Sequence, residues 1–335
     1  MMTDGNMIEK MIVKLFEETG LGTVELPLRS VSGGLMHRMY KVRAGGKEYA
    51  VKHLNPQIMK RPEALSNFER AERLESLIED AGIPIIPALC FSGRKMLNVD
   101  GEYFYIFDWF DGSITDWNEI TAEQCNLAGS ILGRMHALDP KSGEKSDLDD
   151  ICIDLDSFMK KAEKNNKELF ALLSENKTLI RHAEAELNKA RKILPDIVCI
   201  SDEDMDPKNV MWKDGQPRVI DLECLEYGNP VSHVLQLSLQ WSGAVNCDIN
   251  PGCISSFFDG YLKEYDNGFR RYSEVFGISY SWLEWLEYNI DRALGACADE
   301  NENELANAEV RCTLDRIRYL YDNETKIRSV LEAIR

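Results

Sequence analysis

A change in the spacing of apolar residues near Phe110 constrains the fold more than any other feature of the sequence. Before this point the chain contains short β-like runs separated by turns, at 26–31, 39–42, 49–53, 87–92 and 103–109. After it, apolar residues recur at helical spacing, at 122–138, 155–173, 177–194, 231–241 and 280–294. The sequence therefore predicts an α+β protein with a strand-rich N-terminal lobe, residues 1–110, and a mostly helical C-terminal lobe, residues 111–335.

Two helices are expected beside the strands of the N-terminal lobe. Apolar residues at helical spacing from Ile8 to Thr19 predict an amphipathic opening helix that packs on this lobe. One main helix is expected from Pro62 to Ala81, because Gly82 and Pro84 end it. The strands themselves are separated by glycine pairs, which favours an antiparallel sheet joined by short turns.

The charge balance limits the partners of this chain. Its 335 residues include 39 Lys and Arg against 57 Asp and Glu, which gives a net charge of −18. Such a field repels nucleic acid backbones and anionic membrane surfaces and attracts cationic ligands. No nucleic-acid or membrane partner is expected, and nothing in the sequence indicates an obligate protein partner.

The cysteines and the N-terminal segment indicate a cytoplasmic protein. None of the nine cysteines stands in a Cys-x-x-Cys pair, so neither a disulfide framework nor a zinc site is predicted. Charged residues interrupt the apolar ones between Met1 and Gly20, so no signal peptide is expected. No stretch approaches the ~20 apolar residues that a membrane span needs.

A short strand-rich segment, 198–222, interrupts the helical lobe and carries most of the candidate chemistry. In it, Asp204 and Asn209 have the Asp-x-x-x-x-Asn spacing of a kinase catalytic loop. A carboxylate at Asp204 can accept the proton of a hydroxyl and orient it, and the amide oxygen of Asn209 can bind magnesium without adding charge. Asp204 is therefore the candidate catalytic residue and Asn209 a candidate metal ligand.

A second metal ligand is expected from the strand that follows. Lys213-Asp214-Gly215 predicts a tight turn, and the returning strand brings Asp221 beside Asn209. Glu223 lies two residues further on, so in an extended segment it shares the side of Asp221 and could assist a second metal ion. The alternative for Glu223 is a side chain that faces solvent.

Three elements of the N-terminal lobe could bind phosphates. Lys52 ends a predicted strand, where its side chain could reach the α- and β-phosphates of a nucleotide. On the next helix, Glu72 is expected to pair with Lys52, and Glu69 is the alternative. Ser32-Gly33-Gly34 lies between two strands, where it is either a phosphate-binding turn or an ordinary hairpin turn.

Together these residues resemble the aminoglycoside phosphotransferase and choline kinase group, and most closely the bacterial phosphotransferase family, over roughly 31–241. The resemblance implies a two-lobed, protein-kinase-like fold that binds ATP and Mg²⁺ between its lobes and phosphorylates a hydroxyl of a small molecule. It also implies that backbone groups of Asp108, Trp109 and Phe110 bind adenine, and that His136 is structural.

One residue departs from the pattern of that family, whose loop usually reads His-x-Asp-x-x-Pro-x-x-Asn. Asp202 stands where the histidine is usual and could support the loop only as an acceptor or with a raised pKa. The alternative hypothesis is a catalytically weakened kinase-fold protein that binds nucleotide in a regulatory or spore-coat-like role. A bound divalent cation would offset the repulsion among the carboxylates at 202–204, so an active enzyme is favoured.

The acceptor is expected to be a hydroxylated small molecule, and a cationic one fits the charge of the chain. An aminoglycoside, choline, a sugar or a nucleoside would use the same core residues. Trp282, Trp285 and Tyr288 lie in the helical lobe, either in the core or in a substrate pocket. The other four histidines have no partner at ligand spacing, which argues against a hydrolase: His37, His53, His182 and His233.

Overall fold

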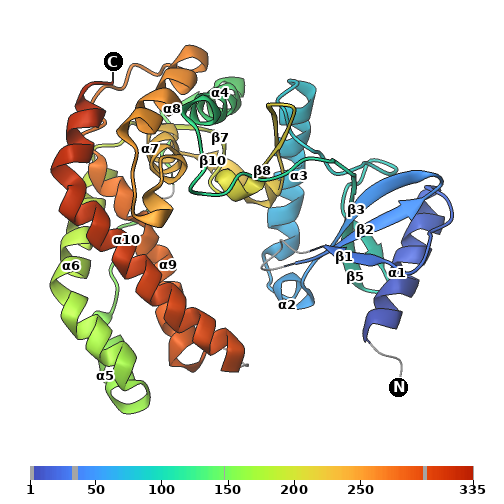
Figure 1. The fold of residues 1–335 in the computed structure, drawn as a ribbon, viewed down its shortest axis with the longest axis horizontal. Helices are drawn as coiled ribbons and strands as arrows, with labels where there is room; N and C mark the ends of the chain where they lie inside the picture. Colours follow the sequence, from blue (N-terminus) through green and yellow to red (C-terminus); the bar gives the residue numbers. More distant parts are fainter. Residues whose placement is uncertain (1–3, 32–36, 147, 297–299, 335) are drawn as a thin grey trace. The chain divides into compact units, whose positions relative to one another are not determined.

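The computed structural model describes residues 4–31, 37–146, 148–296 and 300–334 (Figure 1). The chain forms two compact units. The first contains Met1–Ile114 and Asn209–Leu225, and the second contains Thr115–Lys208 and Glu226–Arg335. The expected lobes were 1–110 and 111–335, whereas the first unit also contains 111–114 and Asn209–Leu225, because Trp212 pairs with Ser113 and Val219 with Ile85.

An antiparallel sheet of five strands forms the first unit, in the order β1-β2-β3-β5-β4. The strands are β1 (Arg29–Val31), β2 (Arg38–Ala44), β3 (Lys47–His53), β4 (Leu97–Val99) and β5 (Glu102–Asp108). In the centre of the sheet, Lys52 of β3 lies opposite Met39 of β2 and Tyr105 of β5. The predicted antiparallel sheet is therefore confirmed.

The opening helix α1 (Asp4–Thr19) packs on this sheet, as predicted (Figure 1). Ile8, Ile12 and Phe16 lie on the buried face of α1, where they join Val51 and Ile106 in one core cluster. Their spacing of four residues places them on one side of the helix, so the sequence pattern and the packing agree.

The main helix of the sheet unit is α3 (Ala64–Asp80), which follows the short helix α2 (Pro56–Met59). The strand predicted at 87–92 is wrong. Only isolated bridges occur there, because Ser92 and Gly93 have φ of 51° and 81° and turn the chain back on itself.

The second unit is mostly helical. Its helices are α4 (Ala122–Leu138), α5 (Leu155–Asn165), α6 (Lys167–Arg191), α7 (Pro230–Trp241), α8 (Pro251–Glu264), α9 (Trp282–Asp291) and α10 (Glu300–Glu332). Three short strands form its sheet, in the order β10 (Leu225–Gly228), β7 (Ile197–Asp202) and β6 (Lys141–Ser142). The sequence predicted α4 with its observed bounds, whereas α8 and α10 were not predicted.

Helices α4 and α8 approach each other closely at glycines. A Cβ on Gly129 would lie 2.0 Å from the carbonyl oxygen of Phe257, and one on Gly260 would lie 1.9 Å from that of Asn126. Glycine is therefore required at both positions by backbone contact. In the part of the chain that the structure describes, no helix is both long and apolar enough to span a membrane.

Candidate active site

Lys52 is the centre of a charged cluster in the first unit. Its side chain is 7% exposed, and its Nζ lies 2.5 Å from Oδ1 of Asp221 and 2.5 Å from Oε1 of Glu223. Burial lowers the pKa of Lys52, but the carboxylates of Glu223 and Asp221 more than compensate, so the pKa is raised. The ammonium therefore stays charged inside the protein.

The predicted pairing of Lys52 with Glu72 is wrong. Oε1 of Glu72 accepts hydrogen bonds from the backbone N–H of Met96 and the hydroxyl of Tyr105, each at 2.9 Å. Within the described residues, no ion pair joins Lys52 to either Glu69 or Glu72. Tyr105, which lies opposite Lys52 in the sheet, donates its hydroxyl to the carboxylate of Glu72 in place of Lys52.

Glu223 faces inward, so the solvent-facing alternative is wrong. Its side chain is 20% exposed, and Oε2 lies 2.9 Å from Nε2 of His37. The other ring nitrogen of His37, Nδ1, accepts the backbone N–H of Asn55 at 2.9 Å, so Nε2 carries the proton that Glu223 accepts. Burial raises the pKa of Glu223, but the hydrogen bond from His37 and the charge of Lys52 outweigh it and hold that pKa low.

A hairpin brings Asn209 and Asp221 to the same end of two strands, as predicted. Strands β8 (Val210–Lys213) and β9 (Gln216–Val219) pair antiparallel. Asp214 and Gly215 form the turn with φ of 51° and 74°, which is typical of a two-residue hairpin loop. At the open end the N–H of Ile220 donates to the carbonyl of Asn209 at 2.9 Å.

Asp221 has an unusual backbone conformation, with φ of 61°. Residues other than glycine rarely adopt this left-handed region, and such strain concentrates at functional sites. In this conformation Asp221 directs its carboxylate to Lys52. A pocket of the first unit is lined by Lys52, Asp221 and Glu223, with apolar side chains that include Phe68, Ala88 and Phe107.

The segment expected to bind adenine, 108–110, begins at the last residue of β5. Asp108 lies opposite Tyr49 in the sheet, and the N–H of Trp109 donates to the carbonyl of Glu48 at 3.2 Å. This N–H is therefore already hydrogen-bonded to the neighbouring strand. Phe110 packs its ring within 2.4 Å of where a Cβ on Gly112 would lie. The expected phosphate-binding residues Ser32, Gly33 and Gly34 lie outside the described residues.

The loop of Asp204 belongs to the second unit. It ends at Lys208, and the next residue, Asn209, belongs to the first unit. Nζ of Lys208 lies 2.7 Å from Oδ1 of Asp204 and 2.7 Å from Oδ2 of Asp206. Burial raises the pKa of Asp206 to about 6, although Lys208 opposes this shift. The two carboxylates raise the pKa of Lys208 to about 12 against the effect of its burial.

Two side chains support the start of this loop. Asp202 is buried, and its Oδ1 accepts the backbone N–H of Asp204 at 3.0 Å, so it serves as an acceptor. His136 is fully buried between Ser201, 3.0 Å from Nε2, and Tyr261, 2.8 Å from Nδ1. Burial holds the pKa of His136 well below its usual range, which fits the structural role expected of it.

Two of the three aromatic residues of α9 that the sequence indicated, Trp285 and Tyr288, are not core residues. Trp285 and Tyr288 are 41% and 43% exposed, and their rings stack with centroids 5.4 Å apart. Nε1 of Trp285 donates to the carboxylate of Glu309 at 3.1 Å. The core interpretation of these two side chains is therefore wrong, and an aromatic surface with an acidic neighbour remains.

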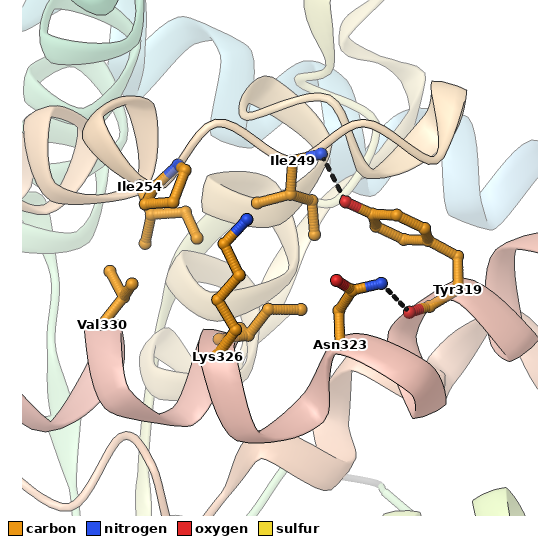
Figure 2. A pocket seen from close by; sticks show the side chains of 8 residues that line it. Ile249, Ile254, Tyr319, Asn323, Lys326 and Val330 are labelled. Atoms are coloured by element: carbon orange, nitrogen blue, oxygen red, sulfur yellow. Dashed lines mark hydrogen bonds between the residues drawn. The ribbon is translucent and has the colours of Figure 1, made fainter.

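A further hollow lies between α8 and α10, where Lys326 extends beside Ile249 and Ile254 (Figure 2). Tyr319 borders it and accepts the N–H of Ile249 at 2.8 Å. The hollow contains no carboxylate and none of the predicted site residues. It is not the candidate active site.

Among the residues described, no group of three or more His, Cys, Asp or Glu side chains is arranged to hold a metal ion by itself. The oxygen donors near Lys52 are the two carboxylates of Asp221 and Glu223. A metal ion bound there would need further ligands from Asn209 or from a bound substrate.

Comparison with known families identifies one match. The family model of the phosphotransferase enzyme family matches residues 27–275, well over half of the chain. Comparison of the sequence with curated proteins finds no match.

Three solved structures illustrate the likeness of fold. A spectinomycin phosphotransferase in complex with ADP and spectinomycin has 13% identity and a TM-score of 0.64, over 97% of this chain and 98% of that one. An amicoumacin kinase in complex with AMP-PNP and Ca²⁺ has 12% identity and a TM-score of 0.59, over 94% of each chain. Choline kinase from Cryptosporidium parvum has 13% identity and a TM-score of 0.54, over 96% and 99%. The predicted α+β, protein-kinase-like fold is confirmed.

Proposed function

Because the chain belongs to the phosphotransferase enzyme family, we propose that it is a cytoplasmic, ATP-dependent kinase that phosphorylates a hydroxyl of a small molecule. The observation that carries the proposal is the contact of Lys52 with Asp221, two residues 169 positions apart in the sequence. A buried ammonium beside a carboxylate is the arrangement needed to bind phosphate oxygens and a metal ion together.

The residues present fit Mg²⁺ as the metal. Asp221, Glu223 and the amide of Asn209 are oxygen ligands, which this cation prefers, and nucleotide phosphates would complete its coordination. Bound there, Mg²⁺ would neutralise negative charge on the phosphates. The ammonium of Lys52, which forms ion pairs with Asp221 and Glu223 in this structure, would bind phosphate oxygens.

Asp204 would accept the proton of the acceptor hydroxyl. The bond between the γ-phosphorus and the oxygen that bridges it to the β-phosphate breaks, and a bond from the γ-phosphorus to the acceptor oxygen forms. ADP leaves with the bridging oxygen, and the proton passes through Asp204 to solvent. Lys208, 2.7 Å from Asp204, fixes the orientation of this carboxylate.

The acceptor is proposed to be hydroxylated and cationic. The net charge of −18 attracts cations to the protein, and the exposed ring of Trp285 offers an aromatic face to one, whereas the guanidinium of Arg292 already lies over the ring of Tyr288. Spectinomycin is bound in one similarly folded protein and choline gives another its name, and each of these molecules combines a hydroxyl with a cationic nitrogen.

A mass-spectrometric screen tests the proposal. The protein is incubated with ATP, Mg²⁺ and a panel of amino sugars, amino alcohols, sugars and nucleosides, and products are searched for a gain of one phosphoryl group. The expected result is one phosphorylated class that disappears with Asp204→Ala and with Asp221→Ala. Tight nucleotide binding without any product would support the regulatory alternative.

Nucleotide binding separates the roles of the two aspartates. Asp221→Asn removes a proposed metal ligand, so it should weaken Mg²⁺-dependent binding of a non-hydrolysable ATP analogue more than Asp204→Asn does. Isothermal titration calorimetry with and without Mg²⁺ measures both. Equal affinities of the two variants would contradict the assignment of Asp221 to the metal.

A further inference from the structure

The loop that carries Asp204 has no histidine of its own, yet side chains from elsewhere in the second unit contact Ser201, Glu203 and Met205. His136 of α4 lies 3.0 Å from the hydroxyl of Ser201. At the other end, Nε1 of Trp241 donates to the carbonyl of Met205 at 2.9 Å. Between them lies Glu203, immediately before Asp204 in the sequence.

Glu203 is held by a histidine on helix α7. Nε2 of His233 lies 2.7 Å from Oε1 of Glu203. The ring is 2% exposed, whereas the carboxylate is 48% exposed. The hydrogen bond from His233 holds the pKa of Glu203 below its usual range in spite of partial burial. The buried ring of His233 thus contacts Glu203, a half-exposed residue of the loop.

Gly228 makes room for this ring. A Cβ at Gly228 would lie 2.1 Å from Cε1 and 2.7 Å from Nε2 of His233. Gly228 is not among the glycines with positive φ, so its backbone conformation is open to other residues. The absence of a side chain there is explained by the imidazole, which indicates that the position of the ring is a specific feature of this chain.

The contacts of α7 lie on both sides of Asp204 in the loop. His233, near the start of the helix, holds Glu203, and Trp241, at its end, holds Met205. A carboxylate that must orient a hydroxyl depends on the position of its own backbone, and small displacements reduce the rate strongly. One rigid helix therefore holds the side chain of Glu203 and the carbonyl of Met205, the residues immediately before and after Asp204.

We propose that His233 is a positioning residue that replaces the histidine missing from the loop: through Glu203 it holds the backbone of Asp204 in place. The proposal rests on the proposed function for its effect on phosphoryl transfer. The effect on the loop itself is independent of turnover, so the two can be tested separately.

Hydrogen–deuterium exchange of the loop tests the contact without any substrate. His233→Ala should make the amides at 203–206 exchange about tenfold faster, as expected from losing one charge-assisted hydrogen bond. His233→Gln should restore the slow exchange, because the amide nitrogen of glutamine can replace Nε2 as the donor. Glu203→Ala, at a half-exposed position, should reproduce the effect of His233→Ala without a risk to folding.

Matched controls separate the contact from general loosening. His182→Gln changes a histidine that contacts Tyr280 and Tyr321 instead of the loop, so exchange at 203–206 should stay as in the wild type. The double variant of His233→Ala and Glu203→Ala should exchange no faster than either single variant, because both remove one interaction. Unchanged exchange at 203–206 in both single variants would overturn the proposal.

Kinetics supply the second measurement. His233→Ala should lower kcat about tenfold or more and leave the KM for ATP unchanged, and His233→Gln should recover most of the loss. Faster loop exchange with unchanged kcat would overturn the positioning role. A wild-type protein without turnover would instead contradict the proposed function, and the exchange experiment would still decide whether His233 holds the loop.

Discussion

Replacement of Glu223 by glutamine should destabilise the protein because it removes one of the two charges that compensate Lys52. Lys52 is 5% exposed as a residue, and both of its carboxylate contacts are 2.5 Å long. Glutamine has nearly the same shape as glutamate but carries no charge, and its NH2 group replaces one of the two oxygens that face Lys52 and His37. Among the described residues, Asp221 then remains as the charged partner of Lys52.

The size of the effect follows from the burial of Lys52. Removal of the sole partner of a buried charge costs about 3–5 kcal/mol. Because Asp221 stays in place and the amide oxygen can still accept one hydrogen bond, Glu223→Gln should lower the free energy of unfolding by about 1–3 kcal/mol. Glu72→Gln is the matched control: both hydrogen bonds of Glu72 use Oε1, which glutamine retains, so the loss should stay below about 1 kcal/mol.

Urea denaturation of the two variants and the wild type at pH 7 measures both losses. A larger loss for Glu223→Gln than for Glu72→Gln supports Glu223 as the partner of Lys52. Equal losses, or a larger loss for Glu72→Gln, would refute it and restore the pairing expected from the sequence.

Two further predictions concern the second unit. The pKa of Asp206 is raised from 3.8 to about 6, so the folded protein is stabilised by the protonated carboxyl and loses this stabilisation as the pH rises through 6. Asparagine does not titrate, so the free energy of unfolding of Asp206→Asn should improve relative to that of the wild type by up to about 3 kcal/mol between pH 4 and pH 7. Denaturation at both pH values measures this difference. Gly129→Ala should lower the free energy of unfolding by about 1–3 kcal/mol or more, because the new Cβ would lie 2.0 Å from the backbone of Phe257. Gly252→Ala is the control and should lower it little, because its Cβ would meet only the side chain of Asn250, at 3.2 Å. Thermal unfolding compares the two variants.

Local patterns predicted the elements that local interactions determine. The periodicity of 122–138 gave the bounds of α4, and the Asp214-Gly215 turn gave the hairpin that brings Asn209 and Asp221 together. The pattern at 310, 314, 317, 320, 327 and 331 was also helical and indicates α10, which was nonetheless not predicted. Helix α8 gives a weaker signal, because Gly252 and Gly260 interrupt it.

Contacts between distant residues could not be predicted from spacing. Lys52 was expected to use Glu72 on the next helix, but its partners lie 169 and more residues along the chain. His37 and His233 were judged to have no partner at ligand spacing, yet each contacts a carboxylate, Glu223 and Glu203 respectively. No sequence signal connects these pairs, because the fold alone brings them together.

Transfer of the label from γ-labelled ATP to a hydroxylated acceptor, in the presence of Mg²⁺, tests the central claim most directly. Wild-type protein should produce a labelled phosphate ester of one acceptor class, and Asp204→Asn, which keeps the shape of the side chain but cannot accept the proton, should reduce the rate at least about a hundredfold. Equal rates of label transfer by the wild type and Asp204→Asn would contradict the account.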